Sequence, residues 1–138
     1  MRLFSRVLDL ADRLSAPLPA HAHCDLPCGV YDPAQARIEA QSVKAIMERY
    51  QQNQDPDYRT RCIVIKEERA DLVKHHLWVL WTDYFKPEHL AKVPNLHDLV
   101  WRATKAAGDT KRTTDVAVAD KLLALIDEVA AAFQATKS

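Results

Sequence analysis

Apolar residues recur at intervals of three and four positions through most of the chain, which is the spacing of an amphipathic helix. Four such segments follow one another, at about residues 32–50, 57–85, 94–108 and from 113 or 114 onward. Asp32 and Pro33 suit an N-cap and a first turn, and Gly108 suits the end of the third helix. Short connections between four amphipathic helices predict an all-α fold, an antiparallel up-down four-helix bundle.

Two of the predicted buried stripes contain a charged side chain. The stripe of the first helix comprises Ala36, Glu39, Val43, Ile46 and Tyr50, and that of the second comprises Cys62, Ile65, Arg69, Leu72, His76, Val79 and Leu80. Glu39 and Arg69 can lie at the stripe edges and extend their charges into water, which is the simpler interpretation of the spacing. They can instead belong to a buried polar network that orients a metal ligand, because a ligating imidazole usually needs an acceptor on its other nitrogen.

The first 22 residues form a leader that differs from the rest of the chain. Its apolar residues are spaced as one face of a short helix, at Leu3, Val7, Leu10 and Leu14. Charged residues interrupt the continuous apolar run that a secretory signal requires, and two prolines end the helical pattern. We therefore expect residues 1–22 to be a pro-segment that is removed on maturation. Residues 23–138 would then form the mature domain, and the protein would be cytoplasmic.

A cluster of metal-binding side chains follows the leader directly. His23, Cys24 and Cys28 place one imidazole and two thiols within six positions. A cut before His23 would add a free α-amino group, which binds a metal far better than the peptide nitrogen of the uncut chain. Amine, amide, imidazole and thiolate donors together favour a square-planar metal, either nickel or copper. Zinc is disfavoured because no further ligands stand at its usual spacing.

The cluster belongs to a longer motif, His-Cys-Asp-Leu-Pro-Cys-Gly-Val-Tyr at residues 23–31. This motif resembles the nickel-binding hook of the nickel-dependent superoxide dismutases. The resemblance extends over roughly residues 23–138, through the segments 32–39, 64–67, 74–76 and 81–87. It implies a four-helix bundle assembled as a homohexamer, one nickel ion per subunit, and a maturation protease that removes the pro-segment. It also implies the reaction, in which Ni(III)/Ni(II) cycling converts superoxide to dioxygen and hydrogen peroxide.

The resemblance further implies a ligand set. The α-amine and ring of His23, the amide nitrogen and sulfur of Cys24, and the sulfur of Cys28 would bind the nickel ion. Asp25 lies in the turn that returns Cys28 to the metal and would support that turn.

Four residues outside the hook also receive roles from the resemblance. Tyr31 and Tyr84 would restrict access to the open face of the metal. Glu39 and Arg69 would hold the imidazole of His23. For Tyr84 the alternative is a core aromatic residue whose hydroxyl finds a hydrogen-bond partner elsewhere.

Composition excludes several other classes of function. The chain carries 19 basic and 19 acidic residues, so no net charge attracts it to nucleic acid or to an anionic membrane. No apolar stretch is long enough to span a bilayer. Two alternatives stay open: a nickel or copper storage protein that uses the same hook, and a helical interaction module whose Cys24 and Cys28 form a redox-active dithiol. Cys62 is expected to be a buried, inert thiol.

The remaining histidines and tryptophans receive no catalytic role. The histidines are expected to be structural or surface groups, namely His75, His76, His89 and His97. The tryptophans are expected in the core or at a subunit interface, namely Trp78, Trp81 and Trp101.

Overall fold

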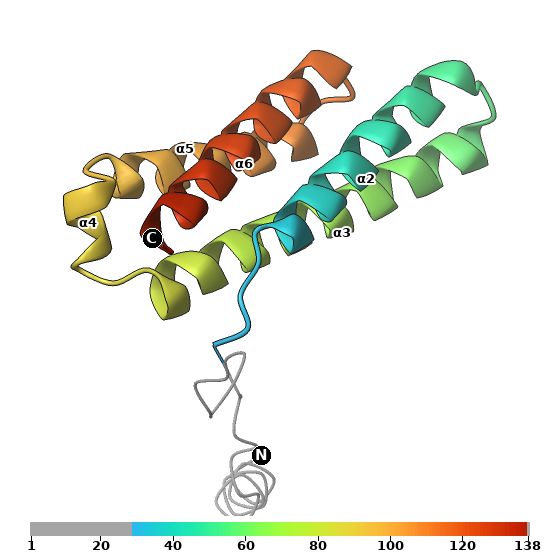
Figure 1. Ribbon diagram of the computed structural model, residues 1–138. Helices are drawn as coiled ribbons and strands as arrows, with labels where there is room; N and C mark the ends of the chain where they lie inside the picture. Colours follow the sequence, from blue (N-terminus) through green and yellow to red (C-terminus); the bar gives the residue numbers. More distant parts are fainter. Residues whose placement is uncertain (1–28, 138) are drawn as a thin grey trace, which may run out of the picture.

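The chain forms a bundle of helices that follow one another in sequence order (Figure 1). The computed structural model describes residues 29–137, and within this range every regular element is helical. The elements are α2 (Ala34–Gln52), α3 (Pro56–Val79), the π-helical turn η1 (Leu80–Tyr84), α4 (His89–Lys92), α5 (Leu96–Lys111) and α6 (Val116–Thr136). The predicted pro-segment and the hook residues His23, Cys24, Asp25 and Cys28 lie outside the described residues.

Four long helices, α2, α3, α5 and α6, enclose the core. α2 packs against α3, α3 against α5, α5 against α6 and α6 against α2, so the four form a closed ring in up-down order. The predicted antiparallel four-helix bundle is thereby confirmed. α3 extends beyond the start of α2, on the side where the chain from residue 29 approaches the bundle (Figure 1). No helix in the described part of the chain is both long and apolar enough to cross a membrane.

Aspartates stand at the start of three helices. Asp32, Asp55 and Asp115 each accept a hydrogen bond from a backbone N–H two or three residues later, at 2.8, 2.7 and 3.0 Å. These bonds satisfy donors that have no partner within the first turn of a helix. The predicted start of the first helix is confirmed to within a residue. The last helix begins later than predicted because Asp115, rather than a threonine, caps it.

The prediction that Gly108 ends the third helix is wrong. α5 continues to Lys111, and the glycine lies inside it. A Cβ atom at this position would lie 3.3 Å from Nζ of Lys74 on α3. The glycine therefore makes room for a side chain of the neighbouring helix, a packing role that sequence spacing does not distinguish from a helix end.

On α2 and α3, several of the buried residues lie one position later in the sequence than the predicted stripes. The buried residues are Ala36, Ala40, Val43 and Met47 on α2, and Cys62, Lys66, Ala70, Val73 and Leu77 on α3. Ala40 and Ala70 are 0% exposed, whereas their neighbours Glu39 and Arg69 are only partly buried. The prediction weighted large apolar side chains, but small side chains on these faces let the helices lie close together. The predicted stripe of α5 is confirmed at all four positions, Leu96, Leu99, Val100 and Ala103.

The three tryptophans lie on the surface, so the expectation that they could be core residues is wrong. Trp78, Trp81 and Trp101 are 49%, 41% and 63% exposed. Together with His97 they line a groove of about 450 Å³ between α3, η1 and α5. The ring of Trp81 is fixed there, because its Nε1 donates a hydrogen bond to Nδ1 of His97 at 2.9 Å.

One buried position is occupied by a lysine. Lys66 is 1% exposed, and its Nζ donates to the carbonyl oxygens of Thr110 at 2.7 Å, Lys111 at 3.0 Å and Thr113 at 2.7 Å. These carbonyls belong to the end of α5 and to the connection into α6, so the ammonium group caps a helix from inside the bundle. Burial lowers the pKa of Lys66, because removal from water disfavours its charged form.

We expect Lys66→Met to lower the free energy of unfolding by about 3 kcal/mol, because methionine fills the space but leaves three carbonyl oxygens without their donor. Urea denaturation followed by circular dichroism measures this change. Lys121→Met, at an exposed position of α6, is the control and should change stability by about 0.5 kcal/mol or less. Equal effects of the two substitutions would contradict the capping role.

Candidate metal centre

Gly29, Val30 and Tyr31 connect the predicted hook to α2. Gly29 has a φ of +68°, in the left-handed region that favours glycine. It directly follows Cys28, so this backbone conformation redirects the chain between a predicted ligand and the bundle. Val30 is 77% exposed, whereas Tyr31 packs against the core cluster that also carries Tyr84. Tyr31 is therefore the side chain that anchors the base of the hook.

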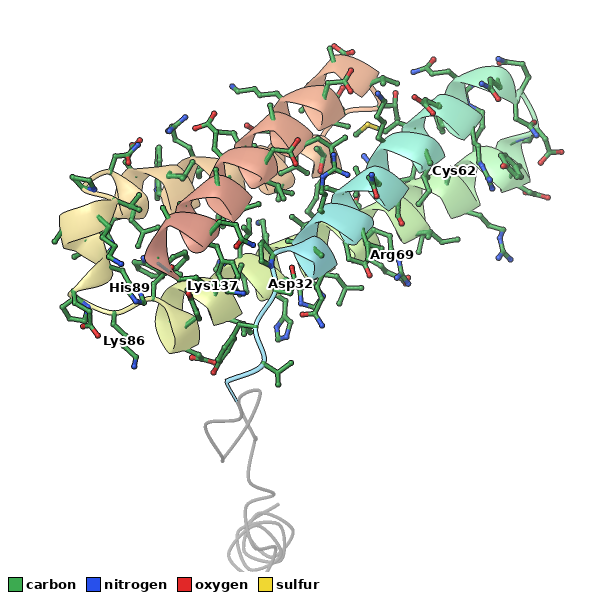
Figure 2. All side chains as sticks on the ribbon, in the orientation of Figure 1. Asp32, Cys62, Arg69, Lys86, His89 and Lys137 are labelled. Carbon is green, nitrogen blue, oxygen red and sulfur yellow. The ribbon has the colours of Figure 1, made fainter. Side chains whose placement is uncertain are left out.

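A pocket of about 310 Å³ opens beside this base. Its lining comprises Gly29, Tyr31, Asp83, Tyr84, Lys86 and His89. The structure thus brings together the two tyrosines that the resemblance singled out, with ring centroids 5.6 Å apart. Figure 2 places Lys86 and His89 toward the same end of the bundle. The pocket combines elements from the hook base, η1 and the start of α4.

The ring of Tyr84 is held by three further rings. Its centroid lies 4.4 Å from that of Phe133, 5.1 Å from that of Phe85 and 5.5 Å from that of His89. Its hydroxyl oxygen lies 2.8 Å from Oγ1 of Thr136. The side chain of Tyr84 therefore packs on the core cluster, as the core interpretation expects, and it also lines the pocket, where the role implied by the resemblance stays a prediction.

Three side chains of the pocket, Asp83, Lys86 and His89, were not predicted as site residues. His89 lies outside the segments that carry the resemblance, and Asp83 and Lys86 lie in the segment 81–87 but received no role from it. All three line the pocket because η1 and α4 stand on either side of the connection at residues 85–88, to which Lys86 belongs. The backbone N–H of Lys86 donates to Nδ1 of His89 at 3.2 Å. The neutral imidazole therefore carries its proton on Nε2, where it can donate a hydrogen bond.

Glu39 and Arg69 form an ion pair across the α2–α3 contact. Nη1 of Arg69 lies 3.2 Å from Oε2 and 3.4 Å from Oε1 of Glu39. The side chain of Glu39 is 16% exposed and that of Arg69 is 38% exposed. The two charges therefore meet each other, and they do not simply extend into water from separate stripe edges. Figure 2 shows Arg69 on the α3 side of this contact.

Within residues 29–137, no group of three or more histidine, cysteine or acidic side chains could hold a metal ion. Cys62 is confirmed as buried and free. No site in this part of the chain therefore competes with the predicted hook. The donors of the hook, which are two thiols, one imidazole and a potential α-amine, match the preferences of nickel, so the residues present fit that metal.

Comparison with known proteins decides the family. A model of the family described as nickel-containing superoxide dismutase matches residues 18–137. The chain belongs to the nickel-containing superoxide dismutase family. Two relatives called superoxide dismutase [Ni], from Streptomyces coelicolor and Streptomyces seoulensis, are each 54% identical to it over 129 residues. Each alignment covers 93% of this chain and 98% of the relative.

Solved structures of nickel superoxide dismutase share the fold. The native structure is 56% identical, superposes with a TM-score of 0.81, and is matched over 83% of this chain and 98% of its own. An apo structure is 53% identical, with a TM-score of 0.77, and is matched over 79% of this chain and 98% of its own. Nickel is accordingly the cofactor of this family, in agreement with the chemistry of the hook.

We expect Glu39 and Arg69 to be energetically coupled. A double-mutant cycle with Glu39→Gln and Arg69→Met should give a coupling of about 0.5–1 kcal/mol in the free energy of unfolding, because the pair is only partly shielded from water. The ion pair of Arg37 with Asp127, at 2.8 Å and more exposed, is the matched control and should show a smaller coupling. An absence of coupling between Glu39 and Arg69 would show that their ion pair does not persist in solution.

Proposed function

We propose that this protein is a superoxide dismutase whose nickel ion is bound by His23, Cys24 and Cys28. The observation that carries the proposal is a family match over residues 18–137 together with a hook motif that contains the donors nickel needs. Bound nickel supplies one-electron chemistry that converts two superoxide anions and two protons to dioxygen and hydrogen peroxide. The donors are the α-amine and imidazole of His23, the amide nitrogen and thiolate of Cys24, and the thiolate of Cys28.

In this proposal the pocket residues control what reaches the hook. The rings of Tyr31 and Tyr84 stand 5.6 Å apart between centroids and narrow the approach to small species. Their hydroxyl groups can hold water, which supplies the protons that the peroxide product needs. Lys86 is exposed at the pocket and adds positive potential for an anionic substrate.

The ion pair between Glu39 and Arg69 would position the histidine ligand. A carboxylate has about four lone-pair sites, so Glu39 keeps acceptor capacity beyond its contact with Arg69. We assign one of these sites to the ring N–H of His23, and the contact with Arg69 orients the carboxylate. Asp25, in the turn between the two cysteines, would support the loop that returns Cys28 to the metal.

The leader, residues 1–22, would be a pro-segment that a maturation protease removes. The native solved chain is matched over 98% of its own length but over 83% of this one, and the unmatched share is close to that of residues 1–22. The chemistry supports the same conclusion, because the nitrogen of His23 becomes a basic amine only after the cut. The charges within the leader support a cytoplasmic location.

We expect the protein that begins at His23 to gain superoxide dismutase activity with nickel, and the chain that begins at Met1 to stay inactive. Pulse radiolysis of superoxide decay, with nickel content by mass spectrometry, measures both. Cys24→Ser or Cys28→Ser should abolish turnover and leave the helical circular dichroism unchanged. Cys62→Ser is the control cysteine and should keep nickel and activity. Equal activity of the uncut chain would contradict the amine-ligand proposal, and bound nickel without turnover would favour a storage protein.

The exposed tryptophans support assembly of the protein with copies of itself. Monomeric proteins rarely leave large apolar patches exposed, and aromatic residues are enriched at the centres of interfaces. We propose that the groove of Trp78, Trp81 and Trp101 contacts a second copy of the chain. The resemblance described above implies that the full assembly is a homohexamer.

Light scattering coupled to size exclusion should therefore report a hexamer for the mature protein. Trp101→Ser should shift the assembly toward smaller species at micromolar concentration, because it removes the most exposed of the three rings. Val64→Ser is the matched control, because Val64 is also an exposed apolar residue but lies on α3 outside the groove. This substitution should leave the mass of the assembly unchanged. A monomeric wild-type protein would overturn the assembly proposal without affecting the metal site.

A further inference from the structure

The hydroxyl of Tyr84 ends a chain of two hydrogen bonds that leads into the last turn of α6. Its oxygen lies 2.8 Å from Oγ1 of Thr136, and that Oγ1 lies 2.7 Å from the carbonyl oxygen of Phe133. Thr136 is only 9% exposed. The chain therefore runs from the lining of the pocket toward the interior, at the end of the bundle where Figure 2 labels Lys137.

The direction of both bonds follows from their partners. A carbonyl oxygen only accepts, so Thr136 donates its single hydroxyl proton to Phe133. The backbone N–H of Lys137, which would bond this carbonyl in a regular α-helix, bonds to the carbonyl of Gln134 at 3.1 Å. Because Thr136 has no second proton, Tyr84 is the donor in the bond between the two hydroxyls. The reverse arrangement would take the hydroxyl away from the Phe133 carbonyl, at the cost of one hydrogen bond.

This direction determines what Tyr84 presents to the pocket. A phenol has one proton, and here that proton is directed at Thr136. The lone pairs of the Tyr84 oxygen take no part in this bond, so the group can accept a hydrogen bond from water in the pocket that Tyr84 lines but cannot donate one to an anion there. Anions bind through donors, and a hydrogen bond to a charged group is stronger than a neutral one.

The ring of Tyr84 does not depend on Thr136 for its position. The rings of Phe133, Phe85 and His89 surround it, with centroids 4.4, 5.1 and 5.5 Å away. Loss of the threonine hydroxyl should therefore leave the ring in place and release only the phenolic proton.

We propose that Thr136 is a positioning residue that makes the Tyr84 hydroxyl an acceptor toward the pocket and so weakens the binding of small anions beside the hook. This inference rests on the proposed function, because the pocket is the approach to the metal in that proposal. A tyrosine that donated instead would hold anions at the site where superoxide must enter and from which the product must leave.

Four variants of the nickel-loaded protein test the proposal, with azide as the probe anion and the nickel absorption spectrum as the readout. Thr136→Val should lower the dissociation constant for azide roughly tenfold, because the released phenolic proton gains a charged acceptor. Thr136→Ser keeps the hydroxyl and should behave as wild type. Tyr84→Phe and Thr136→Val/Tyr84→Phe should have equal azide affinities, because the threonine acts only through the phenol.

A second readout needs no metal. In the nuclear magnetic resonance spectrum of the metal-free chain, the Tyr84 hydroxyl proton should be protected from exchange and lie close to the Thr136 methyl group. Thr136→Ser should keep this protected signal and Thr136→Val should lose it. An unprotected hydroxyl proton in wild type, or an azide affinity unchanged by Thr136→Val, would overturn the inference. A wild-type protein that neither binds nickel nor removes superoxide would instead overturn the proposed function, while the metal-free spectrum would still test the direction of the bond.

Discussion

The packing of Tyr31 against Tyr84 joins the segment that follows the predicted hook to the bundle, and the proposed metal site depends on this contact. A short ligand segment needs a rigid support if it is to hold a metal in one arrangement. Tyr84 supplies that support because it belongs to η1, a π-helical turn at the far end of α3, and its ring is held by the rings of Phe133, Phe85 and His89. Such π-helical turns occur frequently at functional sites. In the proposed site the bundle would therefore contribute a fixed wall, and the hook would contribute the donors.

The bundle itself could be predicted from the spacing of apolar residues, because four segments repeat at the helical period and each begins near a capping aspartate or a proline. The details failed where small or charged residues occupy the core. Ala40 and Ala70 are buried at positions that a scale of side-chain size ranks low, and Lys66 is buried because three carbonyls satisfy it. The prediction for Gly108 failed for a similar reason, because the glycine makes room for the side chain of Lys74 on another helix.

The candidate site was predictable in part. The ligand set and the two tyrosines could be named from the motif, and the structure brings Tyr31 and Tyr84 together. The spacing of apolar residues in α2 and α3 showed that Glu39 and Arg69 lie on or beside the buried stripes. Only the packing of the two helices shows that the two side chains form an ion pair. Thr136 was missed because its partner, Tyr84, lies 52 residues away in the chain and Thr136 itself belongs to none of the segments that carry the resemblance. Sequence reasoning can nominate donors that lie close together in the chain, whereas contacts between helices need the fold.

Nickel K-edge X-ray absorption of the mature protein tests the central claim most directly, because it reports the atoms that surround the metal. For protein that starts at position 23, the account predicts two sulfur neighbours together with nitrogen donors, and a loss of one sulfur when either hook cysteine is replaced by serine. A nickel ion surrounded by nitrogen and oxygen alone, or a spectrum that does not change when the leader is left attached, would contradict it.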